Sequence, residues 1–218
     1  MADVERTISL HAVAVQHIVL VASLGAGCWA VPRAYGITLV GSPTHVLLTI
    51  VPILSAVTLL TYSLGPMRDT TTWVATRLAR GALGLVAGAV LFHVLAVLYG
   101  APLIDKALNT HLWGWMVSCL AVAPSACVLG GDGDSWRRLY ARASPSGFKE
   151  AALCIPAHGA VLGAWMGAWP IPLDWERPWQ VWPITCTVGA VLGYIAALGV
   201  THVVGWWMYT PKLKQKHL

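Results

Sequence analysis

The sequence predicts an all-α membrane protein, a polytopic bundle of about six transmembrane helices with both termini in the cytosol. Only 11% of its 218 residues are charged, 57% are hydrophobic and the mean hydropathy is +0.66. A soluble domain would carry roughly a quarter of charged residues. No alternating strand pattern recurs, so a β-barrel is not expected. At this length the chain is expected to form one transmembrane domain over residues 1–218.

Apolar windows of about 19 residues mark the expected spans. They cover roughly 8–31, 44–65, 79–99, 111–129, 151–169 and 183–204. Pro124 and Pro156 interrupt the fourth and fifth spans, which makes these two the weakest. Neighbouring helices can satisfy the backbone groups that a proline frees, so both are kept as spans. The first span has an acidic flank and a long apolar run, so it is expected to be retained as an anchor.

The basic residues alternate between the two sides of the expected bundle. Eleven of the 14 Lys and Arg residues lie in the N-terminal segment, the second and fourth connections and the C-terminal segment. Arg33, Lys106 and Arg177 lie on the other side. Basic residues favour the cytosolic face, so both termini are expected there and the 170–183 loop faces the lumen or exterior. The anionic membrane surface accounts for the positive charge, and nucleic acid is not an expected partner.

The fourth connection contains a candidate interfacial helix. Residues 136–142 combine Trp, Tyr and three arginines in the pattern of a short helix lying at the membrane surface. Asp134 and Ser135 precede it and are expected to cap it. The Gly-Asp run over 130–135 lacks the further oxygen ligands of a calcium loop, so calcium binding is not expected.

The connection between the last two spans, PIPLDWERPWQVWP over residues 170–183, is the most distinctive segment of the chain. Its prolines are Pro170, Pro172, Pro178 and Pro183; its tryptophans are Trp175, Trp179 and Trp182; its charged residues are Asp174, Glu176 and Arg177. Four prolines exclude a regular helix. Tryptophan beside a few charges suits the membrane–water interface. The segment is therefore expected to be a stiff loop on the membrane surface.

Reactive side chains show no catalytic or metal-binding pattern. The five cysteines form no CxxC pair and fall in or near apolar spans, which is typical of small buried hydrophobes. The eight histidines include no HExxH motif, and His93 and His158 within spans are expected to hydrogen-bond to neighbouring helices. Asp105 and Lys106 fit either a contact with the 170–183 loop or a partner, or a solvated turn. No metal ion, cofactor or catalytic residue is predicted.

Three GxxxG pairs predict close helix packing. They are Gly84/Gly88, Gly163/Gly167 and Gly189/Gly193, in the third, fifth and sixth spans. Each spacing places both glycines on one helix face, where another backbone can approach closely. We expect tight internal packing, with one face left for a partner helix.

Lys214 and Lys216 stand in the C-terminal KQKHL sequence. This arrangement matches the dilysine signal for retrieval to the endoplasmic reticulum, which requires a cytosolic C-terminus. The alternative is a basic membrane anchor that happens to hold lysines at these positions.

Two segments, 163–194 (GAWMGAWPIPLDWERPWQVWPITCTVGAVLGY) and 92–104 (FHVLAVLYGAPLI), resemble the phosphatidylinositol-glycan class F family. They cover about a fifth of the chain. The resemblance implies a non-catalytic subunit of the endoplasmic reticulum membrane that needs no cofactor. It implies a heterodimer with a large catalytic ethanolamine-phosphate transferase that modifies the glycosylphosphatidylinositol (GPI) precursor. That catalytic subunit would be class O, acting on the third mannose, or class G, acting on the second.

Given this resemblance, Trp175, Trp179 and Trp182 are expected to anchor the partner, with the three charged residues as polar contacts. The alternative is that the loop closes the chain's own lumenal face, with Arg177 paired internally. Two other functions remain open. One is a small membrane-embedded lipid-handling enzyme with a lumenal site at Asp105, Asp174, Glu176 and His93, and the other is a transporter.

Overall fold

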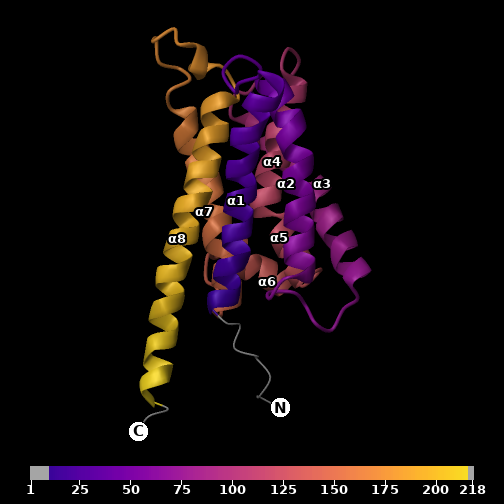
Figure 1. Cartoon of the computed structure of the whole chain (residues 1–218), viewed down its shortest axis with the longest axis vertical. Coiled ribbons are helices and arrows are strands. Elements are labelled where there is room, and N and C mark those ends of the chain that lie inside the picture. Colours follow the sequence, from indigo (N-terminus) through magenta and orange to yellow (C-terminus); the bar gives the residue numbers. More distant parts are fainter. Residues whose placement is uncertain (1–9, 216–218) are drawn as a thin grey trace.

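The computed structural model describes residues 10–215, which form a bundle of long helices running along one axis (Figure 1). Five helices are long and apolar enough to cross a membrane: α1 (Leu10–Tyr35), α2 (Pro43–Leu64), α3 (Val74–Leu98), α7 (Phe148–Ala168) and α8 (Ile184–Gln215). No strand occurs over residues 10–215. The predicted all-α membrane bundle is confirmed.

The fourth predicted span is a broken helix. α4 (Ala107–Ala121) and α5 (Ala123–Leu129) meet at a bend of 40°, and together they are long and apolar enough to form a sixth span. Pro124 lies in the first turn of α5, where the missing N–H cannot continue the hydrogen bonds of α4. Pro156, by contrast, lies inside α7, which continues through it. The bundle thus has five continuous candidate spans and one broken span.

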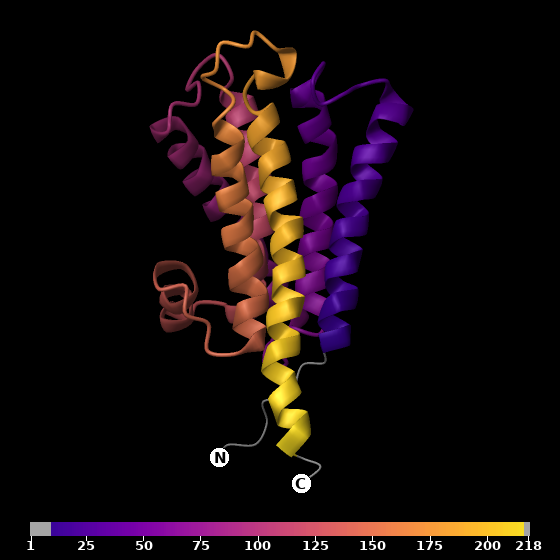
Figure 2. The same ribbon diagram turned by 90° about the vertical axis from the view of Figure 1, so that its left-hand side faces the viewer.

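The connections gather at two ends of the bundle (Figure 2). One end holds the start of α1, the α2–α3 connection, the α5–α7 connection and the end of α8. We call it the basic end because it carries the arginines of these connections and of the first two turns of α3, namely Arg68, Arg77, Arg80, Arg137, Arg138 and Arg142. The opposite end holds the α1–α2, α3–α4 and α7–α8 connections. The helices therefore alternate in the order that the basic residues predicted.

The connection from α5 to α7 is helical but starts earlier than predicted. α6 (Gly133–Trp136) runs into the π-helical turn η1 (Arg137–Ala141). The capping residue is Asp132, whose carboxylate accepts the Asp134 backbone N–H at 3.2 Å and also the Ser135 hydroxyl. The prediction of Asp134 and Ser135 as caps was wrong, because the carboxylate one residue before the helix reaches the free N–H. Arg138 then bonds Glu150 of α7 at 2.7 Å, which ties η1 to the bundle.

α7 and α8 pack through glycine. A Cβ added to Gly163 or Gly167 would collide with backbone carbonyls of α8, and one added to Gly189 or Gly193 with carbonyls of α7. Gly159, one turn before Gly163, extends the same contact although the sequence analysis did not single it out. The two helices thus touch backbone to backbone, as small residues at this spacing allow.

α3 uses its glycines against the broken helix. A Cβ on Gly84 would strike Ala126 of α5, and one on Gly88 would strike Ser118 of α4. All six glycines predicted for helix packing therefore lie at contacts within this chain.

Candidate interaction surface

The 170–183 loop crosses the opposite end of the bundle between α7 and α8 (Figures 1 and 2). Its regular structure is one short 3₁₀ helix, η2 (Pro178–Gln180). The Trp182–Pro183 peptide bond is cis. The loop is thus non-helical along most of its length, as its prolines dictate.

Gln180 holds the loop together from inside. Its side-chain amide donates to the carbonyls of Pro170 at 2.6 Å and Leu173 at 2.7 Å, and its side-chain oxygen accepts the Arg177 backbone N–H at 2.8 Å. Gln180 is only 8% exposed. One buried amide therefore satisfies three backbone groups that would otherwise need other partners.

Trp182 anchors the loop to α4. Its indole N–H donates to the Thr110 hydroxyl at 3.0 Å, and its ring packs on Trp113 with centroids 5.2 Å apart. Thr110 is fully buried, and its hydroxyl donates in turn to the Lys106 carbonyl at 3.1 Å. Trp182 is thus engaged within the chain.

The remaining distinctive side chains of the loop face outward. Trp175 and Trp179 are 54% and 36% exposed, and their rings meet edge to face at 5.8 Å. Asp174, Glu176 and Arg177 are also exposed. Within residues 10–215 none of these three forms an ion pair, so Gln180 and Trp182 hold the loop without internal pairing of Arg177. The loop therefore exposes two aromatic and three charged side chains on a backbone that Gln180 and Trp182 hold in place.

The sequence analysis missed Gln180, Thr110 and Trp113. Gln180 is the one amide in the loop, which is a weak local signal. Thr110 lies 72 residues from Trp182 along the chain, so no local pattern could join them.

The two segments that carry the family resemblance meet at this anchor. The Thr110 hydroxyl lies 3.3 Å from the Pro102 carbonyl, in the α3–α4 connection, and accepts from Trp182 in the loop. Ala101 and Trp182 pack against the same hydrophobic core. The distinctive sequence blocks therefore form one structural unit at the opposite end.

The side chains considered for an enzyme site do not form a metal-binding group. Over residues 10–215, no three His, Cys, Asp or Glu side chains are placed to share a metal ion. His93 lies in α3 with its ring 5.8 Å from that of His111, whereas Asp105, Asp174 and Glu176 are exposed in connections. Asp105 and Lys106 form no ion pair within the same residues.

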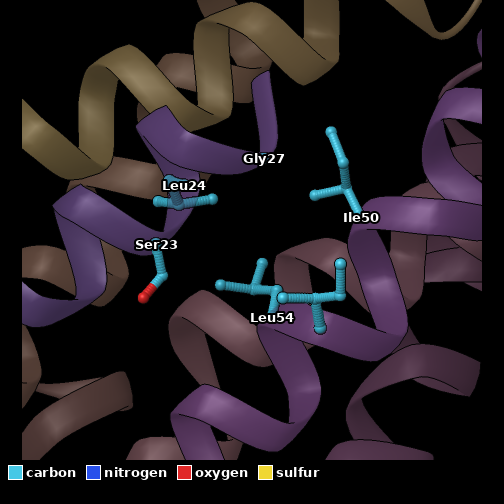
Figure 3. A pocket seen from close by; sticks show the side chains of 6 residues that line it. Ser23, Leu24, Gly27, Ile50 and Leu54 are labelled. Carbon is cyan, nitrogen blue, oxygen red and sulfur yellow. The ribbon is translucent and has the colours of Figure 1, made fainter. Parts of the chain in front are cut away.

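A small hollow lies between α1 and α2 (Figure 3). Leu24 and Gly27 of α1 face Ile50 and Leu54 of α2, with Ser23 at the edge. Its volume is about 10 Å³, which is room for about one water molecule. It therefore cannot hold a substrate.

The lysines of the retrieval motif are at the limit of what the structure describes. Lys214 lies in the last turn of α8, and Lys216 lies outside the described residues. The retrieval signal stays a prediction.

Comparison with known families agrees with the resemblance. Residues 9–202 match the family described as "GPI biosynthesis protein family Pig-F". The chain belongs to the Pig-F family. The match to this Pig-F protein runs from the start of α1 into α8, and it includes both halves of the anchor around Thr110.

Several Pig-F relatives are similar over part of their length. A human protein, "GPI ethanolamine phosphate transferase, stabilizing subunit", is 47% identical over 116 residues, which are 53% of this chain and 53% of the relative. "Glycosylphosphatidylinositol anchor biosynthesis protein 11" of Yarrowia lipolytica is 40% identical over 136 residues, 62% of this chain and 58% of the relative. In Schizosaccharomyces pombe, a "PIGF/3-ketodihydrosphingosine reductase fusion protein" is 37% identical over 128 residues, 59% of this chain and 26% of the relative.

The chain thus spans about half the length of the human and Yarrowia relatives. No solved structure matches it.

Proposed function

We propose that this chain is a non-catalytic subunit that binds and stabilises a GPI ethanolamine-phosphate transferase. The observation that carries the proposal is the 47% identity to the human stabilizing subunit, together with the match of residues 9–202 to the family. The partner is a large catalytic subunit of class O or class G, joined to this chain as a heterodimer in the endoplasmic reticulum membrane. The basic end faces the cytosol and the 170–183 loop faces the lumen.

The 170–183 loop is our candidate for the partner contact. Gln180 and Trp182 fix its backbone before binding, so little conformational entropy is lost when Trp175, Trp179 and Arg177 are covered. Trp and Arg are enriched among the residues that dominate binding energy. The hydrogen bond from Trp182 to Thr110 attaches the loop to α4 and so holds the proposed contact residues in position.

Glu176 supports the same assignment. Its φ of 49° lies in the left-handed region, where a backbone conformation of this kind costs a residue other than glycine about 1–3 kcal/mol. The carboxylate is exposed, so no buried contact of its own offsets that cost. A polar contact to a partner gives this residue a role.

Stabilisation follows from mass action. A subunit that binds the folded transferase and not the unfolded chain shifts the equilibrium toward the folded state. Polar helix surfaces of a large membrane subunit are costly when they face lipid, and a bound helical bundle covers them. The chemistry then belongs to the partner, and this chain determines how much of the partner persists.

The test is a mild-detergent purification of the tagged chain from cells, with mass spectrometry of the proteins that accompany it. We expect stoichiometric recovery of a large phosphoethanolamine transferase. Trp175→Ala combined with Trp179→Ala should reduce that recovery, whereas Trp73→Ala, 85% exposed at the basic end, should not. Recovery of the chain alone, with the transferase intact elsewhere, would overturn the proposal.

A further inference from the structure

A large groove opens on the side of the bundle between α3 and α7. Its volume is about 1010 Å³, at the upper end of the roughly 300–1,000 Å³ of small-molecule sites. α3 forms one wall with Leu83, Ala87 and Leu91, and α7 forms the other with Val161. The floor is the junction of α4 and α5 at Val122. α6 and η1 line it at the basic end.

Several of the residues that line the groove are small. Gly84, Gly88, Ala126 and Ala157 line it without filling it. Most of its surface is therefore hydrocarbon, and it lies along a membrane-spanning stretch of α3.

Aromatic side chains build the wall nearest the basic end. The Tyr140 hydroxyl donates to the Ala121 carbonyl at the α4–α5 bend and lies 2.8 Å from the Ser125 hydroxyl. The Tyr140 ring is stacked between Trp136, at 5.2 Å, and His158, at 6.1 Å. Two hydrogen-bond partners and two ring contacts thus hold the Tyr140 side chain in place on this wall.

Two arginines stand at the mouth, where the groove reaches the basic end. Arg80 lies 3.9 Å from the Asp69 carboxylate, and Arg137 forms an ion pair with Asp134. Each guanidinium has five N–H donors, so donors remain after these contacts. A phosphate accepts such donors strongly and in bidentate geometry.

We propose that this groove binds one glycerophospholipid from the leaflet at the basic end. An acyl chain lies along Ala87 and Leu91, and the phosphate is held by Arg80 and Arg137 at the mouth. The arrangement matches an amphipathic ligand, since the length of the groove is apolar and its cations lie at the interfacial end. A transmembrane helix would match the apolar walls but leave the remaining N–H donors of Arg80 and Arg137 without an acceptor, so a lipid is the better occupant. This inference does not depend on which transferase the chain accompanies.

Photo-crosslinking of the full chain in lipid nanodiscs tests the proposal. The probes are phosphatidylglycerol carrying a diazirine on one acyl chain and diacylglycerol carrying the same acyl chain without a phosphate. Mass spectrometry of peptides then locates the labelled residues. We expect phosphatidylglycerol to label the groove-lining stretches 83–92 and 157–161 above the other lipid-facing helices. Diacylglycerol should label these stretches about tenfold less, as expected for loss of a charge-assisted hydrogen bond.

Two matched pairs of variants locate the site. Ala87→Trp should block groove labelling, whereas Ala82→Trp, exposed on the same helix outside the groove, should not. Arg137→Gln should remove the preference for the phosphate-bearing probe, whereas Arg142→Gln, also exposed but not lining the groove, should leave it. Equal yield and thermal stability within each pair show that folding is not the cause.

Three outcomes would overturn the proposal. The first is labelling spread evenly over all lipid-facing helices. The second is equal labelling of Ala87→Trp and Ala82→Trp. The third, in the complex purified from cells, is loss of lipid labelling with protein cross-links at Ala87 in its place. That result would assign the groove to a partner helix.

Discussion

At the scale of single residues, the 170–183 loop is held by a few polar bonds rather than by its prolines alone. The Gln180 side chain hydrogen-bonds three backbone groups, and the Trp182 indole N–H donates a hydrogen bond to the buried Thr110 hydroxyl on α4. Each of these hydrogen bonds is lost when its donor or acceptor atom is removed. A single substitution therefore tests whether that bond holds the loop.

Trp182→Phe should destabilise the chain while keeping the ring contact with Trp113. The lost bond leaves the buried Thr110 hydroxyl without its donor, which costs about 1 kcal/mol. For a chain of this size the melting temperature in detergent should fall by roughly 2–4 °C. Trp165→Phe is the control, since Trp165 is 61% exposed on α7. Equal melting temperatures for the two variants would show that the Trp182–Thr110 bond does not hold the loop.

Tyr140→Phe should loosen the junction of α4 and α5. The hydroxyl bonds the Ala121 carbonyl and the Ser125 hydroxyl, and burial raises the pKa of the phenol to about 12, so it remains a donor at physiological pH. Its loss should cost about 1–3 kcal/mol, because a buried carbonyl is left unpaired. Limited proteolysis of the 130–147 connection measures the effect, with Tyr99→Phe, 81% exposed, as the control. Unchanged cleavage would mean that the bend is held by other contacts.

At the scale of elements, the closest contact in the bundle is that of α7 with α8. The glycines of the two helices place backbone against backbone, so there is no room for even one methyl group at the interface. The contact also fixes both ends of the 170–183 loop, which leaves α7 and enters α8. The position of the loop therefore depends on this helix pair.

Gly189→Ala should separate the pair and destabilise the fold. The added Cβ would collide with the Gly163 carbonyl, and overpacking of this kind costs about 1–3 kcal/mol. Gly199→Ala in the same helix has open space around its Cβ and should be neutral or slightly stabilising. Thermal unfolding of both variants in detergent measures the difference. Two neutral substitutions would show that the helices are less closely packed than described.

At the scale of the whole molecule, the distribution of arginine predicts the orientation of the bundle in the membrane. The basic end should face the cytosol and the 170–183 loop the lumen. Arg142→Cys and Arg177→Cys, each in a chain whose five native cysteines are replaced by alanine, can be probed in sealed microsomes. A membrane-impermeant maleimide should label the first variant at once and the second only after permeabilisation. The reverse order of labelling would invert the bundle.

Much of this architecture could be predicted because it rests on signals within short stretches of sequence. Hydropathy located the five long apolar helices and the bent α4–α5 pair, and GxxxG spacing found residues such as Gly163 and Gly189 that lie at helix contacts. The effects of the two inner prolines could not be told apart, because Pro124 begins a new helix whereas Pro156 is absorbed within one. Trp182 could not be distinguished from Trp175, because its partner Thr110 is 72 residues away. The lateral groove likewise depends on six elements, α3, α4, α5, α6, η1 and α7, that span a long stretch of the sequence.

The most direct test of the central claim is the level of the catalytic transferase subunit in cells that lack this chain. If the chain stabilises the transferase, that level should fall several-fold, since a change of about 1–2 kcal/mol in stability alters abundance to this extent. Re-expression of the chain should restore it, and re-expression of Trp175→Ala with Trp179→Ala, at equal abundance, should not. A transferase that keeps its normal level without this chain would contradict the account.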